Sequence, residues 1–277
     1  MNYINEMKKA IDYIENNLDK DINFEKVSKE VGMSSFYFHR IFTAIIGISP
    51  TAYIRNRRLT VAAQEISKNN ENILDIALKY GFESHEAFSR AFKNFHGVVP
   101  KMAKKDGNEF KNFSKANLDI EVNANNILSY RIESKDIIKV SAFFRKFNIE
   151  NKDEIPKYWK ELKESGTLEK ISNNYKKDLL GICIGTQSDF EYKYGIGIEQ
   201  TEDIETNIEM ETIEIPKSTW VVFKCKGQDE KNINELWTRI YKEFFITSSY
   251  KQCMDIDFEL YDDENTEIWI PISKEQI

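Results

Sequence analysis

Two short stretches of the sequence carry side chains that can contact the edges of nucleic-acid bases. The first holds Ser35, Phe36, His39 and Arg40, and the second holds His85, Glu86, Ser89 and Arg90. Arginine binds guanine bidentately, serine and histidine bond at base edges, glutamate accepts from cytosine, and phenylalanine contacts the thymine methyl group. Both stretches therefore predict base contacts. A simply solvated helix face is the alternative, and Phe36 can equally be a packing residue.

Positively charged residues near both stretches suit the phosphate backbone. Phosphate contacts fix the register of a protein on the duplex, and base contacts then specify the sequence. The candidates for phosphate contact are Arg55, Arg57, Arg58, Lys93, Lys101, Lys104 and Lys105. We expect double-stranded DNA to be the partner of this part of the chain.

A third stretch, DIDFELY, combines carboxylates with aromatic residues. Alternation places Asp257, Glu259 and Tyr261 on one face of a predicted strand. Rings supply contact area and cation–π attraction, and a carboxylate supplies charge, so the pattern predicts a site for a cationic or amphipathic organic molecule. A solvated acidic edge is the alternative that these residues leave open.

Two helix–turn–helix patterns must position the base-reading residues. The stretches SSFYFHRIFTAIIGISP and SHEAFSRAFKNFHGVVP repeat one plan 50 positions apart, which indicates an internal duplication. Each follows a short helical pattern and a glycine turn, at Gly32 and Gly81. Glycine permits the left-handed turn, and Ser34 or Ser84 can cap the next helix. The apolar faces of the two second helices are expected to pack inward. Their opposite faces, which carry the base-reading residues, are expected to be exposed.

One long helix is predicted between the two motifs. Ser49 suits its cap and Pro50 its first turn, and the pattern continues over residues 50–67. Such a helix spans roughly 25 Å. It could hold two recognition helices near the spacing of one DNA turn, about 34 Å. One chain would then read two successive major grooves without a dimer.

Charge and composition divide the chain into two parts. Residues 1–107 carry a formal charge of +3, and the rest carries −10. All three histidines lie in the first part and all four tryptophans in the second. The asymmetry predicts two domains with different tasks. We place an all-α DNA-binding domain at 1–107, a linker at 108–127 and a sheet domain at 128–277.

The second domain is predicted to be a duplicated βαββ unit. Helical patterns cover 154–165 and 232–245, and Trp159 and Trp237 within them are assigned to the core. Strand patterns lie at 137–144, 179–185, 190–199, 208–215, 219–226, 254–261 and 267–272. The fold class is therefore α+β, with a double helix-turn-helix domain followed by a sheet that carries helices on one face and a cleft on the other.

Other residue types narrow the class of protein. Cys183, Cys225 and Cys253 show no metal spacing, which predicts reduced thiols in a cytoplasmic protein. No apolar stretch approaches the ~18 residues of a membrane helix, so we expect no membrane partner. We predict no cofactor, no metal and no catalytic residue.

The stretch GFESHEAFSRAFKNFHGVVP resembles the second motif of the AraC/XylS family of transcription regulators. The matching residues are Gly81, Phe82, Ser84, Phe88, Arg90, Phe92, Lys93, Gly97 and Pro100. The resemblance covers residues 3–106, and RNRRL at 55–59 is similar to the family's linker helix. It implies a bipartite DNA-binding domain of seven helices in the Rob-like subgroup, with both sets of base-reading residues in the family's recognition helices. Phe36 stands where relatives often carry tryptophan.

The C-terminal part resembles the GyrI-like effector-binding domain over residues 128–277. IPKSTWVVFKCKG, INELWTRIYKEFF, DFELYDD and EIWIPI carry this resemblance. It implies that Glu259 is the pocket carboxylate. The implied wall residues are Tyr192, Tyr194, Trp220, Tyr261, Glu267 and Trp269.

The sequence thus predicts a DNA-binding transcriptional regulator with a small-molecule effector, and not an enzyme. We expect RNA polymerase as a further partner. The alternative function is a small-molecule hydrolase or drug-sequestering protein, because some GyrI-like domains hydrolyse ligands with a tyrosine and a glutamate. A pure enzyme would not need the doubled recognition motif.

Overall fold

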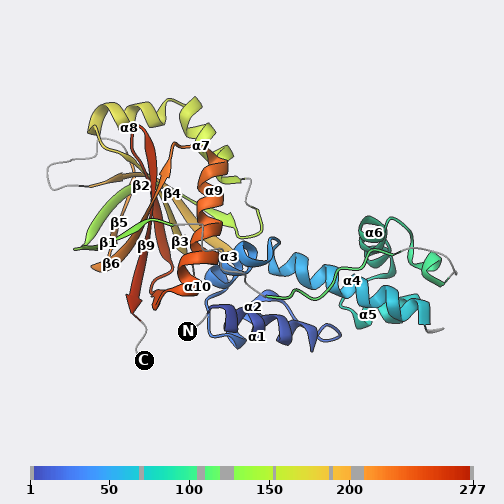
Figure 1. Ribbon diagram of the computed structural model, residues 1–277. Coiled ribbons are helices and arrows are strands. Elements are labelled where there is room, and N and C mark those ends of the chain that lie inside the picture. The colour runs from blue at the N-terminus through green and yellow to red at the C-terminus, as the bar shows by residue number, and fades with distance from the viewer. Residues whose placement is uncertain are drawn as a thin grey trace. The chain divides into compact units, whose positions relative to one another are not determined.

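The computed structural model describes residues 3–68, 72–104, 110–118, 128–151, 154–186, 190–200 and 209–274 (Figure 1). The chain divides into two compact units. The helical unit contains the described residues of 2–35 and 46–120, and the sheet unit contains residues 36–45 with the described residues beyond 120. The predicted domain boundaries at 107 and 128 stay a prediction, and residues 105–109 and 119–127 lie outside the described residues.

Six α-helices and one 3₁₀ helix follow one another in the described residues up to position 104. They are α1 (Tyr3–Glu15), α2 (Phe24–Glu30), α3 (Ser35–Ile46), α4 (Pro50–Lys68), α5 (Ile73–Lys79), α6 (His85–His96) and η1 (Pro100–Lys104). The 19 residues of α4 span about 28 Å. This order confirms the predicted all-α N-terminal part.

Local chemistry explains where these helices begin. The side chain of Asn23 accepts from the Lys26 amide at the start of α2, and that of Ser84 accepts from the Ala87 amide at the start of α6. Ser49 Oγ likewise accepts from the Ala52 amide at 3.2 Å, directly before α4. Each of these bonds satisfies one amide that has no partner within its helix.

The core of the helical unit lies between α4, α5 and α6. Phe88 and Phe92 of α6 are fully buried, and they pack with Leu59 of α4 and Ile76 of α5. These residues recur at helical spacing, so each helix turns one apolar stripe inward. The opposite face of α6 therefore points to solvent.

Part of the predicted linker is bound to the helical unit. The amide of Phe113 donates to Thr60 Oγ1 at 3.1 Å, and the amide of Ala116 donates to the Tyr53 hydroxyl at 3.1 Å. Arg57 donates to the carbonyl oxygen of Phe113. Residues 110–118 are thus a strap held along α4 by hydrogen bonds.

One antiparallel sheet of nine strands forms the second unit within the described residues. The strands are β1 (Tyr130–Lys135), β2 (Ile138–Asn148), β3 (Leu179–Gly185), β4 (Glu191–Glu199), β5 (Glu211–Ile215), β6 (Ser218–Lys226), β7 (Tyr250–Gln252), β8 (Ile256–Tyr261) and β9 (Asn265–Lys274). Their order is β1-β6-β9-β8-β3-β4-β2-β5, and β7 pairs with β9.

The helices of the sheet unit complete the duplicated βαββ plan. They are α7 (Glu154–Glu164), α8 (Thr167–Tyr175), α9 (Glu230–Arg239), the π-helix η2 (Ile240–Phe244) and α10 (Phe245–Thr247) (Figure 1). The first copy runs β2, α7, α8, β3, β4, and the second runs β6, α9, β8, β9. Because β3 pairs with β8, the two copies join at the centre of the sheet.

The sheet curves until its two ends meet. Only two residues separate β1 from β2 in the chain, and only two separate β5 from β6. In each pair, however, the two strands lie near opposite ends of the strand order. Lys217 Nζ in the β5–β6 connection lies 2.7 Å from Asp136 Oδ1 in the β1–β2 connection. Strong curvature gives the sheet an inner face, which is filled by its own side chains.

Pairing register separates the two faces of the sheet. Trp220, Phe258 and Trp269 cluster on one face with the aliphatic residues of β2 and β3. On the other face, the rings of Trp159 in α7 and Tyr261 in β8 are 5.0 Å apart, and Phe244 of η2 packs on Phe223 of β6. The predicted helix-covered face is confirmed. Glu259 and Tyr261 lie on this face, beside α9 and α7, and not on the opposite face where the cleft was predicted.

Candidate functional site

The acidic side chains of β8 gather with tyrosines on the helix-covered face. Cross-strand pairs point to the same side of a sheet. Asp257 lies opposite Cys183 of β3, and Cys183 lies opposite Tyr194 of β4. Glu259, two residues after Asp257, shares its face. Antiparallel pairing thus collects the two carboxylates of β8, Cys183 of β3 and Tyr194 of β4 on one face.

Glu259 is held by two hydrogen-bond donors. The indole Nε1 of Trp237 in α9 donates to Glu259 Oε1 at 2.7 Å, and the hydroxyl of Tyr261 donates to Oε2 at 2.6 Å. Both bonds are charge-assisted and fix the carboxylate in one orientation. Glu259 itself is only partly buried. The arrangement is a pre-oriented negative charge bordered by aromatic rings.

Two tyrosines lie next to Glu259, the buried Tyr194 and the partly buried Tyr261. Trp159 Nε1 donates to the Tyr194 hydroxyl at 2.9 Å. Burial and the neighbouring carboxylate of Glu259 raise the pKa of Tyr194 and that of Tyr261. Both phenols therefore stay protonated near neutral pH and act as neutral, polar-edged walls.

Asp257 is the second carboxylate and lies deeper. Its side chain is 2% exposed and is paired with the guanidinium of Arg40, which is 20% exposed. Burial raises the pKa of Asp257 to about 6, although Arg40 opposes this shift. Burial lowers the pKa of the Arg40 guanidinium, but the interactions with Asp257, Tyr241 and Cys183 together raise it by more.

The structure does not bring all seven predicted effector-binding residues together. Tyr192, Tyr194, Glu259 and Tyr261 share the helix-covered face. Register places the others on the opposite face, because Glu259 pairs with Ile268, so that Glu267 and Trp269, one residue to either side, point away. Trp220 is fully buried beside Trp269 there. The expectation of one continuous cleft from all seven was wrong.

Glu267 has a structural environment on that opposite face. It binds both terminal nitrogens of Arg131 in β1 at 2.7 Å each, and it accepts from Trp269 Nε1 at 3.2 Å. Arg131 also lies over the Trp269 ring at 5.3 Å. These contacts join β1 to β9 across β6.

The first base-reading set is covered, which corrects the expectation of an exposed face. Phe36 is 5% exposed and His39 is 2% exposed, and Ser35 is also buried. The ring of Phe36 lies 5.7 Å from that of Tyr192, and His39 Nε2 lies 3.4 Å from Glu150 Oε1. The sheet unit, to which residues 36–45 of α3 belong, covers Phe36 and His39. Ser35 belongs to the helical unit, and its Oγ lies 3.0 Å from Ser28 Oγ.

The second base-reading set is accessible, as expected. His85, Glu86, Arg90 and the phosphate candidate Lys93 are exposed along one face of α6, and Ser89 between them is partly exposed. Their spacing of three and four residues places them on one face of α6. Their predicted roles in DNA binding stay predictions.

The phosphate candidates differ in their surroundings. Arg55 and Lys101 are exposed. Arg57 instead binds both oxygens of Glu15 at 2.8 Å, and Arg58 donates to the carbonyl oxygens of Leu18 and Lys20. These two arginines connect α4 to α1 and to the residues that directly follow α1. The side chain of Lys104 and all of Lys105 lie outside the described residues.

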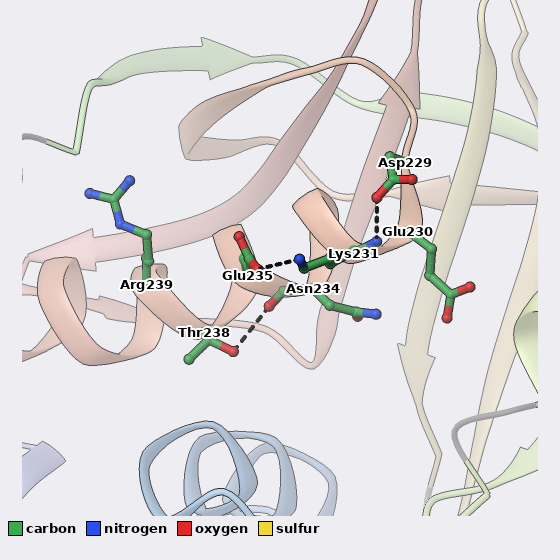
Figure 2. A pocket seen from close by; sticks show the side chains of 7 residues that line it. All are labelled: Asp229, Glu230, Lys231, Asn234, Glu235, Thr238 and Arg239. Atoms are coloured by element: carbon green, nitrogen blue, oxygen red, sulfur yellow. Dashed lines mark hydrogen bonds and ion pairs between the residues drawn. The ribbon is translucent and has the colours of Figure 1, made fainter.

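A separate shallow hollow lies along the solvent side of α9 (Figure 2). Its side chains bond mainly with near neighbours on the same helix. Asp229 Oδ1 accepts from the Lys231 amide at 2.9 Å, and Thr238 Oγ1 donates to the Asn234 carbonyl at 3.0 Å (Figure 2). It has neither a buried charge nor an aromatic wall, so it is the poorer candidate site.

Several simple properties complete the description of the site. Cys183, Cys225 and Cys253 form no disulfide. Among the residues with described positions, no group of three His, Cys, Asp or Glu could hold a metal ion. No helix in the described ranges is long and apolar enough to cross a membrane.

Sequence reasoning missed three members of the site. Trp159 and Trp237 were assigned to the core, yet both are half-buried and bond to Tyr194 and Glu259. Asp257 was grouped with Glu259 but not named as a binding residue. Alternation in β8 carried the signal for Asp257; no pattern in α7 or α9 distinguished an indole that donates to the site from one in the core.

Two family models match the chain. One, described as integron-associated effector binding protein, matches residues 131–272, which is just over half of the chain. The other, a helix-turn-helix domain, matches residues 27–106.

Curated relatives match about a third of the chain. Multiple antibiotic resistance protein MarA of Escherichia coli K12 is 42% identical over 90 residues, covering 32% of this chain and 71% of MarA. The transposon Tn10 TetD protein of Escherichia coli is 40% identical over 94 residues, covering 34% of this chain and 68% of TetD.

Solved structures match about half of the chain. SAV2435 bound to tetraphenylphosphonium has a TM-score of 0.47 and 17% identity, covering 53% of this chain and 94% of that one. A Vibrio cholerae integron cassette protein has a TM-score of 0.38 and 20% identity, covering 52% and 95%. By its family models and curated relatives, the chain belongs to the AraC/XylS family of DNA-binding transcription regulators and carries a GyrI-like domain of the integron-associated effector-binding family.

Proposed function

We propose that this regulator responds to an organic cation with aromatic surface, which binds on the helix-covered face of the sheet. The observation that carries this proposal is Glu259, a partly buried carboxylate oriented by Trp237 and Tyr261. A negative charge among ring faces attracts a delocalised cation through charge and cation–π terms together. Anions of the same shape are repelled.

The same proposal assigns the remaining roles. The exposed face of α6 would contact bases through His85, Glu86, Ser89 and Arg90, and Arg55 and Lys93 would contact phosphates. The DNA-bound regulator would act on RNA polymerase in the cytoplasm. Three cysteines without a disulfide are consistent with that compartment.

A matched pair of probes tests the ligand proposal. Tetraphenylphosphonium and tetraphenylborate have nearly the same shape and opposite charge. We expect only the cation to bind the full chain, and we expect Glu259→Gln to weaken it about tenfold or more, since a charge-assisted interaction of 1.4 kcal/mol or more is lost. Isothermal titration calorimetry measures both affinities.

A comparison variant locates the ligand. Glu267→Gln removes a carboxylate from the opposite face and should leave the affinity for tetraphenylphosphonium unchanged. Equal losses in both variants would show that charge in general attracts the probe. A loss in Glu267→Gln alone would place the ligand on the other face and contradict the proposal.

The second candidate function is hydrolysis, and one observation favours it. Tyr261 and Glu259 are joined by a 2.6 Å hydrogen bond, a pairing that could deliver a proton to a leaving group. Burial raises the pKa of Tyr261, which disfavours tyrosinate as a nucleophile. Turnover of an aromatic ester that disappears in both Glu259→Gln and Tyr261→Phe would establish this function. We propose that the protein is not an enzyme.

A further inference from the structure

A cation already occupies the aromatic side of the candidate effector site, and it comes from the protein. The guanidinium carbon of Arg40 lies 4.3 Å from the ring centre of Trp237, 5.4 Å from that of Phe36 and 5.9 Å from that of Tyr241. Its Nη1 donates to Asp257. A cation surrounded by rings with a carboxylate beneath it is the arrangement expected for an organic-cation ligand.

Arg40 shares a wall of the site with Glu259. Trp237 presents a ring face to Arg40 and donates its Nε1 to Glu259 at 2.7 Å. An aromatic cation that stacks on this ring face and approaches Glu259 must occupy the space of the Arg40 guanidinium. Binding of such a ligand and docking of Arg40 therefore exclude each other.

Arg40 does not dock alone. Phe36 and Arg40 are four residues apart on one face of α3, and Phe36 contacts Tyr192, a predicted wall residue. Tyr37 packs edge-on against Tyr241 at 6.2 Å, and His39 lies 3.4 Å from Glu150. Three of the four residues of α3 that were predicted to read bases, Phe36, His39 and Arg40, therefore contact the sheet unit.

The second recognition helix shows that this burial is not a property of the motif. Arg90 occupies the position of α6 that corresponds to Arg40, and it is exposed. Glu86, which corresponds to Phe36, is exposed as well. At these two positions, only the first copy combines an aromatic residue with an arginine, the pair that can fill a site made of rings and carboxylates.

We propose that Arg40 is an internal ligand of the effector site, so that a cationic effector frees α3 for DNA by displacing it. The inference rests on the proposed function, because it assigns the regulation of the same site. In the docked state, one recognition helix is accessible and the other is occupied. In the effector-bound state, the guanidinium of Arg40 is available for guanine.

The chemistry of the exchange restricts the effector. The incoming molecule must replace a delocalised, planar cation that bonds to Asp257 and covers Trp237. A cation with aromatic rings can replace both interactions, whereas a neutral molecule would leave a buried carboxylate without a counter-charge. A ligand can shift the equilibrium between docked and undocked α3 only by the difference between its affinities for the two states.

Competition between Arg40 and the probe predicts that removing Arg40 increases the affinity for the probe. Arg40→Gln removes the internal cation, so the full chain should bind tetraphenylphosphonium at least tenfold more tightly than the wild type. Structural damage would weaken binding instead. Arg40→Lys keeps a charge but loses the planar fork, so its affinity for tetraphenylphosphonium should lie between those of the wild type and Arg40→Gln.

Arg145→Gln is the matched control. Arg145 also lies over a ring, Tyr158 at 4.1 Å, and binds a carboxylate, Glu161 at 2.8 and 2.9 Å, but it is exposed and belongs to β2, the third strand from β8 in the sheet. The affinity of the Arg145→Gln variant for tetraphenylphosphonium should equal that of the wild type. A gain in Arg145→Gln as large as that in Arg40→Gln would overturn the inference.

Two outcomes separate this inference from the proposed function. If the wild type and Arg40→Gln bind the probe equally, the inference fails and the proposed effector site stands. If neither protein binds it, both fail.

Hydrogen exchange gives a readout that needs no effector. Asp257→Asn removes the carboxylate that holds Arg40, so the amides of α3 should exchange several-fold faster in the full chain, while those of α6 keep their rates. Unchanged exchange in α3 would overturn the inference.

Discussion

At the scale of single residues, the two carboxylates of β8 have different tasks because they lie at different depths. Glu259 is partly exposed and is held by neutral donors, Trp237 and Tyr261. Asp257 is buried and is balanced by one cation, Arg40. Replacing that cation is costly unless another takes its place, since an unpaired buried charge destabilises a fold by several kcal/mol.

The raised pKa of Asp257 makes a prediction about stability. Burial raises this pKa to about 6, so the folded protein binds more protons than the unfolded chain between the ordinary aspartate value and about pH 6. The free energy of unfolding should therefore fall as pH rises through that window, by up to about 1.4 kcal/mol per pH unit from this group. Asp257→Asn should lack this contribution.

Urea unfolding of both proteins between about pH 4 and 6.5 measures the difference. Tryptophan emission is a suitable probe because all four tryptophans lie beyond residue 128. Asp262→Asn is the control, because hydrogen bonds from the amides of Glu264 and Asn265 lower the pKa of Asp262 and move its titration below the window. Parallel pH curves for the wild type and Asp257→Asn would contradict the assignment.

At the scale of elements, the sequence predicted seven of the nine described strands and most helices, but not how the strands combine. The expected strand at 179–185 matches β3, and the expected helix at 50–67 matches α4 within one residue. Period-two alternation gives the faces of each strand separately. Only the register of β8 on β9 shows that Glu259 and Glu267 lie on opposite faces, and register depends on tertiary packing.

Some elements left too weak a local pattern to be predicted. β1 (Tyr130–Lys135) is mostly exposed, and its alternation of apolar and polar residues extends only from Tyr130 to Glu133. The expected helix at 232–245 is interrupted by the π-helix η2, which contains Tyr241 near Arg40. The covered face of α3 could not be predicted either, because the partner that covers it is more than 100 residues away in the chain.

The turn before α6 gives a prediction about an element. Gly81 has φ +76°, and a Cβ atom there would lie 2.6 Å from Nη1 of Arg58. That guanidinium cannot simply move, because it donates to the carbonyl oxygens of Leu18 and Lys20 at 2.9 and 2.6 Å. Gly81→Ala should therefore lose the ~1–2 kcal/mol of a left-handed residue and about 1 kcal/mol more for a disturbed hydrogen bond.

Gly97 is the matched control for Gly81. It has φ +86°, at the end of α6, but no atom lies within 4 Å of a Cβ placed there. Gly97→Ala should lose only the ~1–2 kcal/mol of the backbone conformation. Urea unfolding followed by far-ultraviolet circular dichroism compares the two variants. Equal losses would mean that Arg58 does not brace this turn.

At the scale of the whole molecule, the two parts carry opposite charge and different ligands. The positive N-terminal part suits a polyanion, and the negative C-terminal part suits a cation. α3 belongs to the recognition motif by sequence and to the sheet unit by its contacts. A helix that serves both parts is the element through which one ligand can affect the other.

Thermodynamic linkage makes the last prediction. If tetraphenylphosphonium frees α3 and so raises the affinity for DNA by some factor, then DNA must raise the affinity for tetraphenylphosphonium by the same factor. We expect a factor of about 5 to 150, the usual range of such coupling. Fluorescence polarisation with the DNA upstream of the protein's own gene measures one side, and calorimetry with and without that DNA measures the other.

Variants at corresponding positions of the two recognition helices separate coupling from binding. Arg90→Ala should weaken DNA binding by about 1–3 kcal/mol of base discrimination and keep the coupling factor, because α6 is exposed with or without the probe. Arg40→Gln should reduce the factor to about one, because the guanidinium that the probe displaces is gone and α3 no longer contributes its arginine. A probe that lowers the affinity of the wild type for DNA would mean that the docked state is the one that binds DNA, and the direction of regulation would then be the reverse.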